Sequence, residues 1–209
     1  MPGYGDAAPA ASLTFPGLAD SIAALLDALD VPRAHIVGLS FGGQQAMHLA
    51  LRHPHRIDRL VLADTSYRFG ANGTDANEWK RARLAPLEAG LTPADMAPAV
   101  IDAITARGFS GRERGRVIRA FAPISSAAFR ASVECLPSHD VTDRLAEIDR
   151  PTLVIVGELD DETPIEYAEF IAAHIPGAQL SVIPGAGHLP PTERPDVFNA
   201  RVRSFLTET

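Results

Sequence analysis

Hydrophobic residues along this chain alternate between short unbroken runs and longer stretches in which apolar positions recur at helical spacing. Four unbroken runs predict buried strands, over residues 33–39, 59–63, 151–156 and 179–183. Four amphipathic stretches predict helices, over residues 16–30, 41–53, 164–174 and 195–206. Strands that alternate with helices are typical of a parallel sheet with helices on both of its faces. The pattern therefore predicts an α/β fold in which ligands bind at the carboxyl ends of the strands.

The helix over residues 164–174 has the most clearly marked start. Thr163 and Glu166 have the spacing of a capping box, in which each side chain bonds the other residue's backbone N–H. Pro164 would then be the first helical residue, a position that suits proline. Pro176 and Gly177 are expected to end the helix.

The pattern changes between the second and the third predicted strand. Residues 67–144 show short helical patterns interrupted by glycine and proline, and no strand pattern stands out. We expect a helical insertion between two strands of the sheet. The chain would then consist of a first part of the core (1–66), the insertion (67–144) and a second part of the core (145–209).

Composition narrows the class of protein. Hydrophobic residues make up 46% of the 209 positions and charged residues 22%, as in ordinary globular domains. The formal net charge of −7 disfavours nucleic acid and anionic membranes as partners, because no basic surplus is present to neutralise phosphates. No apolar run is long enough to span a membrane, and the first residues lack the features of a signal peptide.

The single cysteine, Cys135, excludes an intrachain disulfide and fits a reducing compartment. We expect Cys135 to behave as a small buried hydrophobic residue rather than as a reactive thiol. Together with the lack of a recognisable leader, this predicts a cytoplasmic protein.

The most informative motif is Gly-Leu-Ser-Phe-Gly-Gly, from Gly38 to Gly43, between a predicted strand and a predicted helix. In this context Gly-x-Ser-x-Gly is typical of a nucleophile elbow, a turn too sharp for side chains at Gly38 and Gly42. The turn holds Ser40 in a strained conformation with its hydroxyl exposed, and the helix N-terminus behind it favours a developing anion. The alternative is an ordinary glycine-rich turn with a surface serine. The flanking elements and two motifs downstream favour the elbow.

Those two motifs supply a candidate acid and a candidate base. Asp160 and His188 each follow the end of a predicted strand, and 28 residues, enough for one helix and one strand, separate them. The chain order Ser, Asp, His is the order of the catalytic residues in α/β hydrolases. We predict that His188 takes the Ser40 proton and later returns it to the leaving group, and that Asp160 orients the imidazole.

Other carboxylates compete with Asp160 for the role of the acid. Asp161 would take it if the turn is shifted by one residue, and Asp64 offers an alternative position after the preceding strand. Glu158 and Glu162 are weaker candidates. If Asp160 has no catalytic function, its carboxylate is expected to lie in a loop and to be exposed to solvent.

No metal or nucleotide site is predicted. The remaining histidines stand at helix ends, at a strand start, within a helix or in the insertion, and no spacing among them suggests a metal site. Glycine-rich phosphate-binding patterns are absent from the sequence, so no cofactor is implied.

Taken together, the elbow motif, the Pro-Thr-Leu-Val-Ile-Val-Gly strand with Asp160, and Gly-Ala-Gly-His188 resemble the α/β-hydrolase superfamily. The match is most similar to 3-oxoadipate enol-lactonases and related small esterases, and it covers nearly the whole chain. The resemblance implies that residues 67–144 form a helical cap over the active site. It also places Trp79, Arg81 and Arg83 where a cap meets a carboxylate-bearing substrate. The alternative for these residues is a packed tryptophan and a solvated basic face.

The chain departs from the family pattern at its N-terminus. Residues 2–5 resemble the loop after the fourth strand of the family, so the strands before it and the loop that supplies one oxyanion amide are missing from this sequence. The backbone N–H of Phe41 is then the one oxyanion donor that the resemblance identifies. The strand that ends at Leu39 becomes an exposed apolar edge, which invites pairing with a second copy or aggregation. Among truncation, dimerisation and a natural short form, we favour truncation.

These observations predict a serine hydrolase that cleaves a small carboxylic ester or lactone through an acyl-enzyme, without a cofactor. Carbon–carbon bond hydrolysis and cofactor-free perhydrolysis use similar triads and remain alternatives. A catalytically silent ligand-binding protein and an inactive fragment are alternatives of another class. The complete triad argues against a silent binder, and the missing oxyanion loop argues for it.

Overall fold

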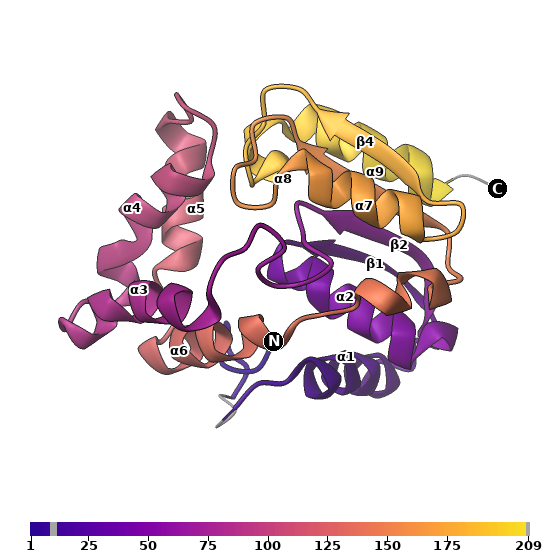
Figure 1. Ribbon diagram of the computed structural model, residues 1–209, viewed down its shortest axis with the longest axis horizontal. Coiled ribbons are helices and arrows are strands. Elements are labelled where there is room, and N and C mark those ends of the chain that lie inside the picture. Colours follow the sequence, from indigo (N-terminus) through magenta and orange to yellow (C-terminus); the bar gives the residue numbers. More distant parts are fainter. Residues whose placement is uncertain (9–11, 208–209) are drawn as a thin grey trace.

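The computed structural model describes residues 1–8 and 12–207 and contains a four-stranded parallel sheet (Figure 1). The strands lie side by side in chain order: β1 (Ala34–Leu39), β2 (Ile57–Ala63), β3 (Thr152–Gly157) and β4 (Gln179–Ile183). Each of the four apolar runs therefore forms a strand, with bounds that agree with the predicted ones within two residues. The predicted α/β fold is confirmed.

The parallel register aligns the carboxyl ends of the strands at one edge of the sheet. Leu39 at the end of β1 pairs with Ala63 at the end of β2, and Gly157 at the end of β3 pairs with Ile183 at the end of β4. The loops that follow the four strands consequently begin close together, which is where ligands bind in folds of this kind.

One face of the sheet is covered by three helices: α1 (Phe15–Ala28), α2 (Phe41–Arg52) and α7 (Ile165–His174). Leu60 and Leu62 of β2 point to this face, where Met47 and Leu49 of α2 are fully buried with them. Because side chains alternate along a strand, the intervening residues of β2 face the other way.

The opposite face is covered by α9 (Pro195–Thr207). Phe198 and Phe205 of this helix pack in one cluster with Val61 and Ile155 of the two central strands. Both faces of β2 and β3 are thus buried, which explains why these two strands are continuous apolar runs in the sequence.

The predicted capping box at the start of α7 is wrong. The helix begins at Ile165, Pro164 occupies the capping position, and no side chain caps the helix. The hydroxyl of Thr163 donates instead to the carboxylate of Asp160, at 2.6 Å. A nearby carboxylate is a strong acceptor, so the threonine side chain is held in the loop rather than over the helix end.

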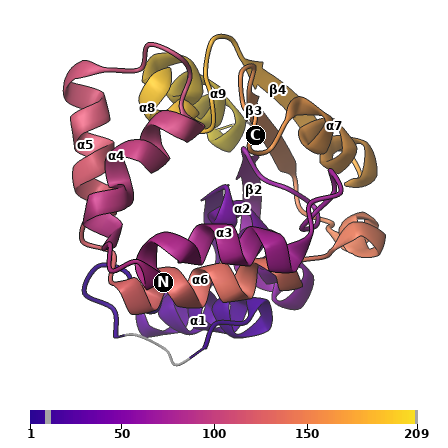
Figure 2. The same cartoon turned by 60° about the vertical axis from the view of Figure 1, so that its left-hand side comes forward.

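Four helices lie between β2 and β3: α3 (Ala76–Glu88), α4 (Pro93–Ile104), α5 (Gly111–Phe121) and α6 (Ser126–Cys135). Figures 1 and 2 show them gathered on one side of the molecule, away from α7. A single antiparallel bridge between Arg68 and Asp140 joins the two ends of this segment near the core. Cys135 is buried, as predicted.

The connections between the longer elements contain short 3-10 helices: η1 (Pro54–Arg56), η2 (Leu136–Ser138) and η3 (Thr142–Glu147). His139, between the last two, is buried, and its Nε2–H donates to the carbonyl oxygen of Ser66 at 2.8 Å. Its Nδ1 is then an acceptor and receives the Nε2–H of His48, at 3.2 Å. Burial lowers the pKa of both histidines to about 4, so this pair is neutral at pH 7 and ties the end of the helical segment to α2.

Strand β1 lies at the edge of the sheet. In residues 1–8 and 12–207 no strand pairs with its outer side, and Val37 at its centre is 47% exposed. The structure thus agrees with the predicted exposed edge. Among the same residues, the helices are too short or too polar to span a lipid bilayer.

Candidate active site

Ser40 occupies a sharp turn between β1 and α2. Its backbone has φ 53° and ψ −120°, in the left-handed half of conformational space that non-glycine residues rarely adopt. A Cβ at Gly38 would lie 2.4 Å from the carbonyl oxygen of Gly42, and one at Gly43 would lie 2.7 Å from the Cβ of Thr65. The turn therefore requires glycine at both positions. The expectation for Gly42 itself is wrong, because a Cβ there would meet open space.

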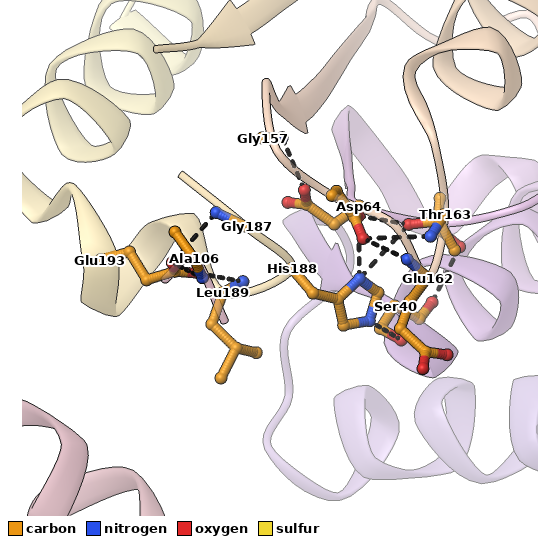
Figure 3. A network of polar contacts seen from close by, with 12 residues as sticks. Ser40, Asp64, Ala106, Gly157, Glu162, Thr163, Gly187, His188, Leu189 and Glu193 are labelled. Carbon is orange, nitrogen blue, oxygen red and sulfur yellow. Dashed lines mark hydrogen bonds and ion pairs between the residues drawn. The ribbon is translucent and has the colours of Figure 1, made fainter. Parts of the chain in front are cut away.

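Three side chains from separate loops form one series of hydrogen bonds (Figure 3). The hydroxyl oxygen of Ser40 lies 2.8 Å from Nε2 of His188, and Nδ1 of His188 lies 2.9 Å from Oδ2 of Asp160. If Nδ1 carries the proton and donates to the carboxylate, Nε2 is free to accept the Ser40 proton. This is the geometry that general-base activation of a serine requires.

Asp160 is buried and fully hydrogen-bonded. Its Oδ1 accepts the backbone N–H groups of Glu162 and Thr163, and its Oδ2 accepts the Thr163 hydroxyl in addition to His188. Burial alone would raise the pKa of Asp160, but the His188 ring and the Thr163 donors outweigh it and hold the pKa below its ordinary value. Asp160 is therefore an ionised carboxylate at neutral pH.

The other acids weighed from the sequence do not contact His188. Glu158 accepts the backbone N–H of Gly185 at 2.8 Å, and Glu162 pairs with Arg83 at 3.0 Å. Asp161 is exposed at the rim of the adjoining pocket. Of these carboxylates, Asp160 alone is hydrogen-bonded to the imidazole in the described part of the chain.

Asp64 is the most unusual of the alternatives. It directly follows β2 with φ 44°, it is buried, and its Oδ1 accepts the backbone N–H of Gly157 at 2.7 Å while its Oδ2 has no partner. Burial raises the pKa of Asp64 to about 9, and the nearby carboxylates of Asp160 and Glu193 add to the shift. Asp64 is thus a neutral carboxylic acid at pH 7, beside an ionised one.

Phe41 is the first residue of α2, directly after Ser40. Its backbone N–H belongs to the first turn of the helix, where no earlier carbonyl within the helix can accept it. The N–H is therefore available to a developing oxyanion next to Ser40, with the favourable end of the helix dipole behind it.

A pocket of about 330 Å³ opens beside Ser40 and His188. Its wall combines residues of the loops after the strands with residues of the helical segment: Gln44, Ser66, Arg68, Phe69, Asn72, Trp79, Arg83, Leu136 and Tyr167 are among them. Most of these side chains are polar or aromatic, so the pocket suits a small molecule with both polar and apolar parts.

The three residues of the helical segment that were singled out from the sequence take different positions. Trp79 and Arg83 line the pocket, and the Arg83 guanidinium lies 5.5 Å from the centre of the Trp79 ring while it pairs with Glu162. Arg81 is exposed and does not line the pocket. The helical period separates them, because residues two apart point to different sides of a helix.

Glu193 contributes to the site although it is not among the residues predicted from the sequence. This residue ends the short helix α8 (Pro190–Glu193), is buried, and accepts three backbone N–H groups beside His188 (Figure 3). Glutamate side chains are ordinarily exposed, and no sequence pattern around Glu193 indicates that this one is buried. The described residues contain no group of three or more His, Cys, Asp or Glu that could hold a metal ion.

Comparisons with known proteins identify the family of the chain. The model of the Alpha/beta hydrolase family matches residues 1–201. The chain is 30% identical over 192 residues to 3-oxoadipate enol-lactonase 2 of Acinetobacter baylyi, which covers 90% of this chain and 69% of that protein. The chain belongs to the alpha/beta hydrolase family.

Solved structures resemble the chain over almost its full length. A hydrolase from Pseudomonas aeruginosa PA01 has a TM-score of 0.87 at 34% identity, covering 99% of this chain and 77% of that one. A thermophilic esterase from Thermogutta terrifontis has a TM-score of 0.85 at 29% identity, again covering 99% of this chain and 77% of that one.

The neutral state of Asp64 predicts a pH dependence of stability. In the unfolded chain this carboxyl ionises near pH 4, whereas in the fold it keeps its proton up to about pH 9. Raising the pH between these values therefore favours unfolding of the wild type. Asp64→Asn cannot ionise, so its free energy of unfolding should rise relative to the wild type by up to about 1.4 kcal/mol per pH unit.

Urea unfolding at pH 5 and pH 8 measures this difference. Asp161→Asn, which changes an exposed carboxyl in a neighbouring loop, is the matched control. An Asp64→Asn protein that is equally destabilised at both pH values would contradict a neutral Asp64.

Proposed function

We propose that this chain is a serine hydrolase for small carboxylic esters or lactones, with Ser40 as nucleophile, His188 as general base and Asp160 as orienting carboxylate. The observation that carries the proposal is the unbroken series of hydrogen bonds from Asp160 through His188 to Ser40, next to a pocket of small-molecule size. The lactonase and esterase names of similar proteins support the ester or lactone class.

In the proposed mechanism Ser40 Oγ attacks the carbonyl carbon while its proton moves to Nε2 of His188. The carbonyl π electrons move to the oxygen, and the resulting oxyanion accepts the N–H of Phe41. Collapse of the tetrahedral intermediate breaks the bond to the leaving alkoxide, which takes the proton from His188. In a lactone this alcohol stays attached to the acyl group. Water, deprotonated by His188, then cleaves the acyl-enzyme and restores Ser40.

Residues 67–144 are proposed to act as the cap that completes the substrate site. The cap supplies Trp79, Arg83 and Leu136 to the pocket, and the loops of the core supply the catalytic groups. Arg83 lines the pocket and pairs with the carboxylate of Glu162, so a carboxylate on the substrate would compete with Glu162 for this guanidinium. Arg81, exposed on the same helix, has no such role in the proposal.

Labelling with a fluorophosphonate probe tests the nucleophile. We expect the wild type to be labelled, Ser40→Ala to be unlabelled and His188→Ala to be labelled at least about a hundredfold more slowly, because the hydroxyl then lacks its base. Ser66→Ala is the matched control, since Ser66 also lines the pocket but lies away from the imidazole contact. A folded wild type without labelling would favour the silent ligand-binding protein.

A pair of arginine variants tests the substrate class. Arg83→Met should raise the KM of an ester with a free carboxylate on its acyl chain about tenfold, because one moderate charge interaction is lost. The KM of a neutral ester should not change. Arg81→Met removes the same charge two residues away and should change neither KM. Equal effects of the two variants on both esters would overturn the role of Arg83.

A further inference from the structure

One buried carboxylate holds the backbone on both sides of His188. Oε2 of Glu193 accepts the N–H of Gly187 at 3.0 Å, and Oε1 accepts the N–H of Leu189 at 2.8 Å (Figure 3). The two residues that flank His188 in the chain are thus fixed to the same side chain. The imidazole cannot shift as a unit with its loop unless at least one of these hydrogen bonds breaks.

The same carboxylate also holds the helical segment. Oε2 of Glu193 accepts the N–H of Ala106 at 2.7 Å, and Ala106 belongs to the link between α4 and α5. The N–H of His188 itself donates to the carbonyl oxygen of Ile104, at 2.9 Å. Residues 104–106 of the cap therefore bond directly to the loop that carries the histidine.

The contact between cap and loop is too close for a side chain at Gly187. A Cβ there would lie 2.6 Å from the backbone nitrogen of Ala106 and 2.9 Å from the carbonyl carbon of Thr105. Glycine at this position lets the two backbones approach, and Glu193 joins them. The join is thus built from backbone groups of both segments around one acidic side chain.

We propose that Glu193 is a positioning residue that couples the cap to His188. It fixes the backbone around the histidine and ties it to residues 104–106, so that the base stays in line with Ser40 only while the cap is docked. This inference rests on the proposed hydrolase function. Displacement of a catalytic group by about 1 Å typically costs on the order of a hundredfold in rate, which makes such a tie consequential.

Glu193→Gln tests the coupling with little change in size. Glutamine keeps one acceptor oxygen, but its amide group must face either the Leu189 N–H or the N–H groups of Gly187 and Ala106, so part of the join is lost. For hydrolysis of a short p-nitrophenyl ester, we expect kcat to fall about tenfold and KM to change less than about twofold, because the base is misplaced and the pocket wall is intact.

Glu158→Gln is the matched control. Glu158 also accepts one backbone N–H of the loop that leads to His188, that of Gly185, but it is exposed and touches neither neighbour of the histidine nor the cap. Its kcat should stay at the wild-type value. A folded Glu193→Gln with the same kcat as Glu158→Gln would overturn the proposal.

Ala106→Pro tests the coupling from the side of the cap without changing the Glu193 residue itself. Proline replaces the one N–H that joins the cap to this carboxylate with a ring carbon, and because Oε2 lies 2.7 Å from the nitrogen, the carboxylate must move away from the cap. The extended backbone of Thr105, with ψ 157°, is compatible with a following proline. A several-fold loss of kcat supports the coupling. A wild-type kcat in this variant overturns it, also in the case that Glu193→Gln does not fold.

Hydrogen exchange separates this inference from the proposed function. In Glu193→Gln the amides of Ala106, Gly187 and Leu189 should exchange faster than in Glu158→Gln. If the wild type does not hydrolyse esters and is not labelled at Ser40 by the fluorophosphonate probe, the proposed function fails. Hydrogen exchange then remains the test of whether Glu193 joins the cap to the loop of His188. Unchanged protection of these three amides would then overturn it.

Discussion

The parallel register of the sheet is the constraint on which the candidate site depends. Because the strands run in one direction and end at one edge, the loops after β1, β3 and β4 bring Ser40, Asp160 and His188 into contact although they are far apart in the chain. The contact also depends on the turn at Ser40, where backbone strain is maintained by close packing around Gly38. The strands thus position the candidate catalytic residues, which lie in the loops that follow them.

Asp160 and Asp64, two carboxyl groups at this edge of the sheet, differ in charge because their surroundings differ. Asp160 has hydrogen-bond donors on both oxygens and stays ionised, whereas Asp64 has one donor and a buried oxygen without a partner, so it keeps its proton. A second negative charge beside Asp160 would compete for the imidazolium that forms during the proposed reaction. The neutral state of Asp64 leaves Asp160 as the one ionised partner of His188 among the described residues.

Much of the fold and of the candidate site could be predicted from the sequence, because the strands and the turn at Ser40 are local sequence patterns. The hydrophobic pattern identifies the strands. Ser40, Asp160 and His188 each stand in the loop that follows the end of one strand. Predictions that depend on tertiary neighbours were less successful. The Thr163 hydroxyl donates to Asp160 and does not cap α7. Glycine is required at position 43, where Thr65 lies close by, and not at position 42. Glu193 was missed because nothing local shows that three distant N–H groups converge on it.

The central claim is that Ser40 forms a covalent acyl intermediate. The most direct test is peptide mass mapping after acid quench of the protein mixed with a slowly hydrolysed p-nitrophenyl ester. The account predicts the mass of one acyl group on the peptide that contains Ser40, formed together with the first burst of p-nitrophenol and then lost. Steady release of p-nitrophenol with no acyl group on Ser40, or with the acyl group on another residue, would contradict it.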